Sequence, residues 1–192
     1  MEDEREIALE RTPFVATQLA EGYDGVGTLP VQVILHDVRS LYNVGAFFRT
    51  ADAVQLEQIC LSGITGHPPH REIAKTALGA QDHVRWSRPS DPLEYIETLR
   101  NLEFEVAAVE TSSTAVDLFD WQPRFPVALL FGHEVNGLDG ALLASCDTHV
   151  RLPMRGVKHS LNVATAGGVV LYELLRKYRR LCDRGGGSPD RL

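Results

Sequence analysis

Three short segments carry residue types suited to chemistry, and each follows an apolar run typical of a buried strand. The first is HDVRSLYNVGAFFRTAD (36–52). Asn43 is a candidate cap at the start of a helix, where backbone N–H groups can also hold an anion. Arg49 lies among Phe47 and Phe48, an apolar neighbourhood in which an arginine needs a partner. A salt-bridged arginine on the surface is the alternative interpretation.

The second segment, LLFGHEVNGLD (129–139), places one carboxylate between two glycines. Gly132 and Gly137 permit a tight backbone that can pass close to a cofactor. Glu134 would then be presented at that point. An ordinary strand-to-helix turn explains the same residues equally well.

The third segment is LPMRGVKHSLNVATAGGVVLYE (152–173). Ser160 is a candidate cap of the final helix, with Asn162 in its first turn. The small residues at 164–168 include two glycines, each of which costs about 1 kcal/mol in a helix relative to alanine. This run therefore predicts close contact with a partner backbone, and a merely poor helix is the alternative.

Standard fingerprints of other functions are absent from the sequence. It contains no GxxxxGK[ST], no GxGxxG after a strand, no GxSxG and no HExxH. His67 and His70 lack the spacing of a zinc site, so we interpret them as solvated loop histidines and expect no metal. Three scattered cysteines without a CxxC indicate a reducing, cytoplasmic setting. No apolar run is long enough for a membrane span, and the acidic N-terminus does not look like an export signal.

Charge is distributed unevenly along the chain, whose net charge is −7. Residues 1–30 have a net charge of −5, whereas residues 151–192 have a net charge of +6. This asymmetry is compatible with a basic face on an acidic body. Candidate phosphate contacts are six basic residues, with ordinary solvated charge as the alternative: Arg39, Arg71, Arg85, Arg88, Arg155 and Lys158.

Apolar runs alternate with segments of helical periodicity. Strands are predicted at 31–35, 58–62, 83–87, 104–110, 127–131 and 148–152, and helices at 43–54, 71–79, 91–102, 138–146 and 160–181. The pattern predicts an α/β domain with a mostly parallel sheet and helices on both faces, and an antiparallel edge is the alternative. Ligands are expected beyond the carboxyl ends of the strands, in the loops after residues 35, 110, 131 and 152. We expect an N-terminal arm (1–29), one domain (30–182) and a disordered tail (183–192).

Taken in order, the three segments resemble the SpoU–TrmH family of RNA ribose 2′-O-methyltransferases, in the knotted SPOUT superfamily. The resemblance covers roughly residues 31–178. The matching positions are Asn43, Gly45 and Arg49; Gly132, Glu134 and Gly137; Pro153, Met154, Ser160, Leu161, Asn162 and Val163; and the segment KTALGA (75–80). One departure is His133, which stands where the family has asparagine.

The resemblance implies a C-terminal trefoil knot, a homodimer with the active site near its interface, and S-adenosylmethionine bound in the knot. The implied catalytic residues are Arg49, Glu134, Asn162 and Asn43, and the implied cofactor contacts are Thr111, Gly132, Leu152, Met154, Ser160 and Leu161. Two roles stay open for Arg49. It is either the base for the 2′-hydroxyl or a clamp on the adjacent phosphate, since a guanidinium is effectively always protonated.

Other functions remain open from the sequence. The chain could methylate a base, as other knotted methyltransferases do, or be a catalytically idle RNA-binding or ribosome-assembly factor. A third alternative is an α/β binding domain unrelated to RNA. Both tRNA and rRNA fit the family, and we favour tRNA because only about 30 residues precede the domain and no accessory domain is recognised.

Overall fold

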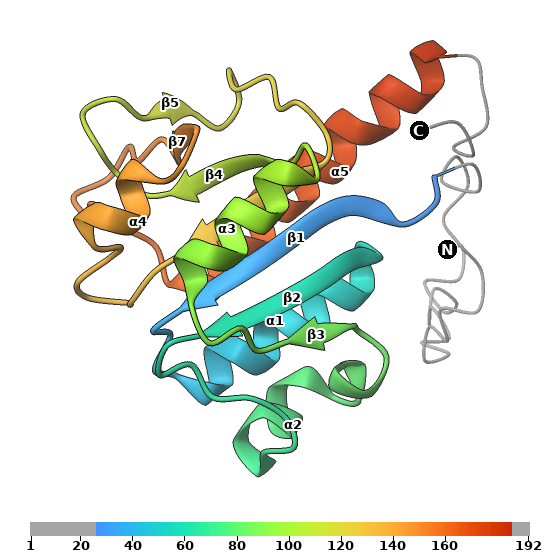
Figure 1. The fold of residues 1–192 in the computed structure, drawn as a ribbon, viewed down its shortest axis with the longest axis vertical. Coiled ribbons are helices and arrows are strands. Elements are labelled where there is room, and N and C mark those ends of the chain that lie inside the picture. Colours follow the sequence, from blue (N-terminus) through green and yellow to red (C-terminus); the bar gives the residue numbers. More distant parts are fainter. Residues whose placement is uncertain (1–25, 186–192) are drawn as a thin grey trace, which may run out of the picture.

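The structure, a computed structural model, describes residues 26–185 (Figure 1). The elements in chain order are β1 (Leu29–His36), α1 (Leu41–Ala53), β2 (Leu56–Ser62), α2 (Arg71–Ala77), the 3₁₀ turn η1 (Ala80–Asp82), β3 (Trp86–Ser87), α3 (Pro92–Asn101), β4 (Glu105–Val109), β5 (Val116–Asp117), β6 (Val127–Phe131), α4 (Gly140–Ala144), β7 (Thr148–Arg151) and α5 (Val163–Gly185). Most of the predicted arm and tail lies outside the described residues, and α5 includes the first three residues of that tail.

Seven strands form one sheet in the order β3-β2-β1-β6-β4-β7-β5. Every strand pair in the described part of the chain is parallel, so the α/β prediction is confirmed and the antiparallel edge is wrong. Strand order reverses between β1 and β6, where Val33 is in register with Ile59 on one side and Leu129 on the other. Ligand sites are expected at such a switch. The trefoil knot is not decided by strand pairing and stays a prediction.

Helices cover both faces of the sheet because successive strand residues point to opposite sides. On one face, Val33 and Leu129 pack with apolar residues of α1, α2 and α5. On the other, Ile34 and Leu130 pack with α3 and α4. In Figure 1, α3 and α4 lie in front of the sheet and α1 and α5 behind it. No helix among residues 26–185 is long and apolar enough to span a membrane.

The cap of α1 differs from the prediction. Ser40 caps the helix, because its hydroxyl accepts a hydrogen bond from the backbone N–H of Asn43 at 3.3 Å. Asn43 therefore lies in the first turn, where its amide side chain is free to bond elsewhere. The prediction failed because the apolar repeat was taken to begin at Asn43, whereas α1 begins two residues earlier.

The start of α5 shows the opposite shift. Asn162, not Ser160, acts as the cap, since Asn162 Oδ1 accepts hydrogen bonds from the backbone N–H groups of Ala164 at 2.9 Å and Thr165 at 3.1 Å. Ser160 is left in the preceding loop. Both caps follow the ordinary preference of helix starts for small polar side chains, but neither could be placed from residue type alone.

The edge strands are shorter than predicted, and two histidines have structural roles. Only Trp86 and Ser87 of the predicted 83–87 strand pair with β2, and the short strand β5 was not predicted. His67 stacks on Trp86 with ring centroids 5.7 Å apart. His70 caps α2 by accepting from Glu72 N at 3.1 Å. The interpretation of both as merely solvated histidines is therefore wrong.

The two glycines of α5 have different environments. A Cβ on Gly167 would lie 2.2 Å from Cε1 of Phe47, so α5 approaches α1 closely enough to exclude any side chain there. Phe47 in turn packs edge-on against Phe131, with centroids 5.1 Å apart. A Cβ on Gly168 would meet nothing within 4 Å. Packing within the chain thus explains one glycine of the pair and leaves the other open.

We expect Gly167→Ala to lower the free energy of unfolding by about 1 to 3 kcal/mol, because the new methyl group collides with the ring of Phe47. Gly140→Ala in α4 is the matched control, since a Cβ there meets nothing within 4 Å. Urea denaturation should show the control unchanged or slightly more stable. Equal destabilisation by both changes would contradict the packing explanation.

Candidate active site

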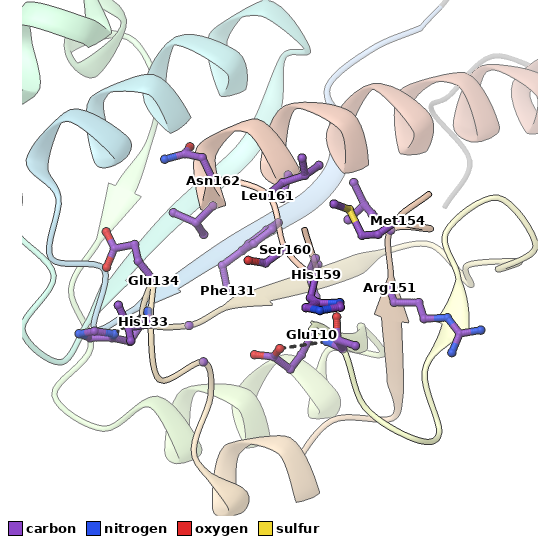
Figure 2. Close-up of a pocket in the computed structure, with 18 of the residues that line it drawn as sticks. Glu110, Phe131, His133, Glu134, Arg151, Met154, His159, Ser160, Leu161 and Asn162 are labelled. Atoms are coloured by element: carbon purple, nitrogen blue, oxygen red, sulfur yellow. Dashed lines mark hydrogen bonds between the residues drawn. The ribbon is translucent and has the colours of Figure 1, made fainter. Parts of the chain in front are cut away.

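A cavity of about 240 Å³ opens at the carboxyl ends of β4, β6 and β7, beside the start of α5. Figure 2 shows His133 and Glu134 on one side of it, Met154 and Arg151 on the opposite side, and Ser160 between them. All six residues predicted to contact a cofactor line this pocket: Thr111, Gly132, Leu152, Met154, Ser160 and Leu161. Of the four predicted catalytic residues, Glu134 and Asn162 also line it.

Glu134 ties the pocket to the start of α1. Its two carboxylate oxygens accept hydrogen bonds from the backbone N–H groups of Arg39 at 3.1 Å and Ser40 at 3.0 Å. Oε1 also accepts from Nδ2 of Asn43 at 3.1 Å. A single carboxylate thus connects the loop after β6 with the loop after β1, about 90 residues apart in sequence.

Asn43 extends this connection to α5. Nδ2 of Asn162 donates to Oδ1 of Asn43 at 3.1 Å, and Oδ1 of Asn162 caps α5. Because a carboxylate only accepts, the amide of Asn43 must turn its NH₂ group to Glu134 and its oxygen to Asn162. The hydrogen bonds therefore fix the orientation of all three side chains.

The pKa of Glu134 lies below the ordinary value of a glutamate. Burial alone would raise it, but hydrogen bonds from the backbone N–H of Ser40 and Arg39 and from Asn43 stabilise the charged form and outweigh that effect. Glu134 is consequently an ionised acceptor at neutral pH and not a proton donor.

The glycines of the second motif let the loop fold back against the strand. A Cβ on Gly132 would lie 2.6 Å from the carbonyl of Gly137, and Gly137 has a φ of +67°. Backbone hydrogen bonds join His133 and Gly137 in both directions, at 3.1 and 2.9 Å. The loop is therefore compact, and Gly132 lines the pocket.

Arg49 is not part of the pocket. Its side chain is exposed and has no hydrogen-bond or ion-pair partner among residues 26–185. The interpretation of Arg49 as a surface arginine is correct in its exposure, because α1 turns Phe47 and Phe48 into the core and Arg49 outward, but no salt bridge forms within residues 26–185. The structure thus brings Asn43, Glu134 and Asn162 together and leaves Arg49 apart.

Several residues that shape the site were not predicted. Glu110 and His159 line the pocket, and Glu110 accepts a hydrogen bond from Thr111 N at 2.9 Å. Glu110 directly follows β4, and this position beyond the carboxyl end of a parallel strand could have marked it as a pocket residue. Thr65 is buried and bonds both Val38 N and Leu35 O, which fixes the loop that carries Ser40. Nothing in the sequence marks Thr65.

Comparison with known proteins identifies the chain. The SpoU rRNA Methylase family matches residues 30–172. The chain belongs to this family. The matched region contains all three segments that form the pocket, and the SpoU pattern residues Asn43, Glu134 and Asn162 are those joined by hydrogen bonds.

Known proteins and solved structures resemble this chain with identities of 27% to 30%. A Staphylococcus haemolyticus protein assigned to the TrmH family of tRNA/rRNA methyltransferases is 29% identical over 160 residues, covering 83% of this chain and 63% of that protein. The AdoMet-bound rRNA methyltransferase from Sinorhizobium meliloti has 30% identity and a TM-score of 0.71, covering 78% of this chain and 60% of that one. A structure described for the 2-OH methylation of C/U34 on tRNA has 27% identity and a TM-score of 0.68, covering 77% and 90%. The chain spans 59% to 66% of the length of the curated relatives.

We expect Glu134→Gln to lower the free energy of unfolding by roughly 1 kcal/mol at pH 7, because charge-assisted hydrogen bonds to α1 are lost from a partly exposed site. The pKa of Glu134 is lowered by folding, so its contribution is present above the ordinary carboxyl range and disappears as pH falls through the lowered pKa. The difference between wild type and variant should persist at pH 5 and shrink below about pH 4.

Urea denaturation across this pH range measures the effect. Glu97→Gln is the control, since Glu97 is exposed and has no partner among the described residues. A difference for Glu134→Gln that stays constant down to pH 3 would contradict the assignment.

Proposed function

We propose that this protein transfers a methyl group from S-adenosylmethionine to a ribose 2′-hydroxyl of RNA, with tRNA as the first substrate to test. The observation that carries the proposal is the hydrogen-bonded set of Glu134, Asn43 and Asn162 at the edge of the pocket beyond β4, β6 and β7. Membership of the SpoU family supports the same reaction. Two solved neighbours are described as bound to AdoMet, at 30% and 27% identity.

The pocket suits a planar, apolar ligand with polar edges. Leu161 is 42% exposed and Val135 85% exposed at its rim, so apolar surface is available to cover an adenine ring. A Cβ at Gly132 would clash with Gly137, so only glycine lets the loop fold back at this wall of the pocket. Glu110 and Glu134 add negative charge beside the site, favourable for a sulfonium. S-adenosylmethionine would supply the electrophilic methyl group.

Within this arrangement, the protein's residues orient the target ribose and bind the phosphate beside it. Asn43 and Asn162 hold each other and Glu134 in fixed orientations, so hydrogen-bonding groups are in place before a ribose arrives. We assign Arg49 to bidentate binding of the phosphate next to the target ribose, because a guanidinium stays protonated and matches phosphate geometry. The proton of the 2′-hydroxyl then leaves to water or to another group at the site.

A second copy of the chain is proposed to complete the site. Arg49 projects from α1 outside its own pocket, and the neighbouring helix α5 exposes Val169 (40%) and Tyr172 (54%). Gly168 on the same helix has open space where a Cβ would be. Such an apolar stripe beside a bare glycine favours close packing of two helices, and we propose a homodimer in which Arg49 serves the pocket of the other copy.

RNA binding is supported by unpaired basic side chains. The six candidate phosphate contacts are exposed and make no side-chain hydrogen bond or ion pair within residues 26–185: Arg39, Arg71, Arg85, Arg88, Arg155 and Lys158. We favour tRNA because a neighbour whose description concerns tRNA matches over 90% of its own length. Ribosomal RNA and base methylation are alternative outcomes of the assay below.

The proposed activity is tested by incubating the full chain with S-adenosylmethionine and separately with undermodified tRNA and rRNA fractions, then identifying methylated nucleosides by mass. A 2′-O-methylnucleoside from tRNA is expected. A methylated base would contradict the ribose assignment, and a product only from rRNA would change the substrate. Failure to bind the cofactor or to form any product would favour an idle RNA-binding protein.

In the same assay, Arg49→Ala should lower kcat by about 100-fold or more, while the Kd for S-adenosylmethionine stays within twofold because Arg49 lies outside the pocket. Arg49→Lys should also be strongly impaired, since lysine lacks the planar fork. Near-normal turnover of Arg49→Lys would overturn the phosphate-clamp role.

We expect Val169→Glu to convert a dimer into a monomer, because the interface would enclose an unpaired carboxylate. Val116→Glu on β5 is the control, since Val116 is also 40% exposed. Light scattering coupled to size exclusion measures the mass. A monomeric wild type, or dissociation by both changes alike, would contradict an interface on α5.

Mixed dimers test whether Arg49 acts across that interface. Provided that Arg49→Ala and Glu134→Gln are each inactive alone, their co-expressed heterodimer should regain activity, because one pocket then has Glu134 and the other copy's Arg49 intact. A heterodimer without activity would place Arg49 at the pocket of its own chain.

A further inference from the structure

We propose that His133 positions the Glu134 loop as a neutral imidazole, so that cofactor binding weakens when this ring gains a second proton. The proposal deepens the proposed function and rests on it for the identity of the ligand. His133 and Glu134 are adjacent residues, and both line the pocket (Figure 2).

Nδ1 of His133 is the acceptor that closes the loop. It accepts hydrogen bonds from the backbone N–H groups of Val135 at 3.0 Å and Asn136 at 3.2 Å. Two backbone donors point at one ring nitrogen, so that nitrogen must carry a lone pair and no proton. The ring is therefore the tautomer protonated at Nε2.

A second proton would necessarily go to Nδ1. It would remove the acceptor and set an N–H against two other N–H groups, so the turn over 133–136 would have to rearrange. Asparagine, the residue that the family pattern has at this position, offers an amide oxygen that accepts in the same manner and takes up no proton.

The loop holds Glu134 in its bonded position. From within the turn over 133–136, the carboxylate accepts hydrogen bonds from Arg39 N, Ser40 N and Asn43 Nδ2. Gly137 closes the other end of the loop through its backbone bonds to His133. Rearrangement at His133 therefore shifts both the pocket wall and the carboxylate that orients Asn43.

The charged groups around the loop do not compensate for protonation. Glu134 follows in the loop itself, Glu110 at the end of β4 lies against Gly137, and Arg39 precedes α1. The His133 ring forms no ion pair with either carboxylate in the described part of the chain. A positive charge on the ring would thus lose two hydrogen bonds without gaining a paired partner.

The test uses the full chain, isothermal titration with S-adenosylmethionine, and pH 8.0 and 5.0 at constant ionic strength. Wild-type affinity should fall at pH 5.0 by at least threefold more than that of His133→Asn, which keeps an acceptor in place. His133→Ala should bind weakly at both pH values. His83→Asn, a change at an exposed histidine outside the pocket, should follow the wild type.

Nuclear magnetic resonance of the free chain gives a readout without cofactor. The ¹⁵N shift of Nδ1 should show an unprotonated acceptor at pH 8.0, and the amide signals of Val135 and Asn136 should move between pH 8.0 and 5.0 in wild type but not in His133→Asn. Parallel affinity curves for wild type and His133→Asn, or a protonated Nδ1 at pH 8.0, would overturn the proposal. Absence of cofactor binding at both pH values would overturn the proposed function instead, and the resonance experiment would then decide the role of His133.

Discussion

The site depends on one carboxylate that has no positively charged partner among residues 26–185. Glu134 is held by backbone N–H groups at the start of α1 and by the amide of Asn43, so its charge is stabilised by dipoles and not by an ion pair. From there the hydrogen bonds run in one direction, through Asn43 to Asn162 and on to the first N–H groups of α5. Three loops that lie far apart in sequence become one rigid edge of the pocket.

This chain of hydrogen bonds explains why two asparagines are needed. Each must accept on one side and donate on the other, which neither aspartate nor glutamate does when ionised. These hydrogen bonds do not include the positive charge that the site uses. The residues that orient the pocket edge all bond to one another within one copy, whereas the guanidinium of Arg49 is exposed and available to a ligand. Packing of Gly167 against Phe47, and of Phe47 against Phe131, joins this edge to the core.

Sequence patterns correctly predicted the structural elements in which several consecutive residues are buried. The central strands β1 and β6 and the parallel α/β class are correct because fully buried strands leave continuous apolar runs. The caps were misplaced by three residues in α1 and by two in α5, since several polar residues lie near the start of each helix and only the backbone path selects one. The edge strands β3 and β5 are pairs of residues, too short to leave any pattern.

Within the site, the resemblance to the SpoU–TrmH family indicated which residues surround the pocket, and the residues alone did not. The six positions that the resemblance implied as cofactor contacts all line the pocket, at the edge where the loops after parallel strands converge. Arg49 is on the surface because its apolar neighbours in sequence lie on the opposite side of the helix. His133 shows the converse: a position that departs from the family pattern preserves its physical requirement, a lone pair facing two backbone N–H groups. What the loop requires at that position is an acceptor, which the Nδ1 lone pair of His133 provides.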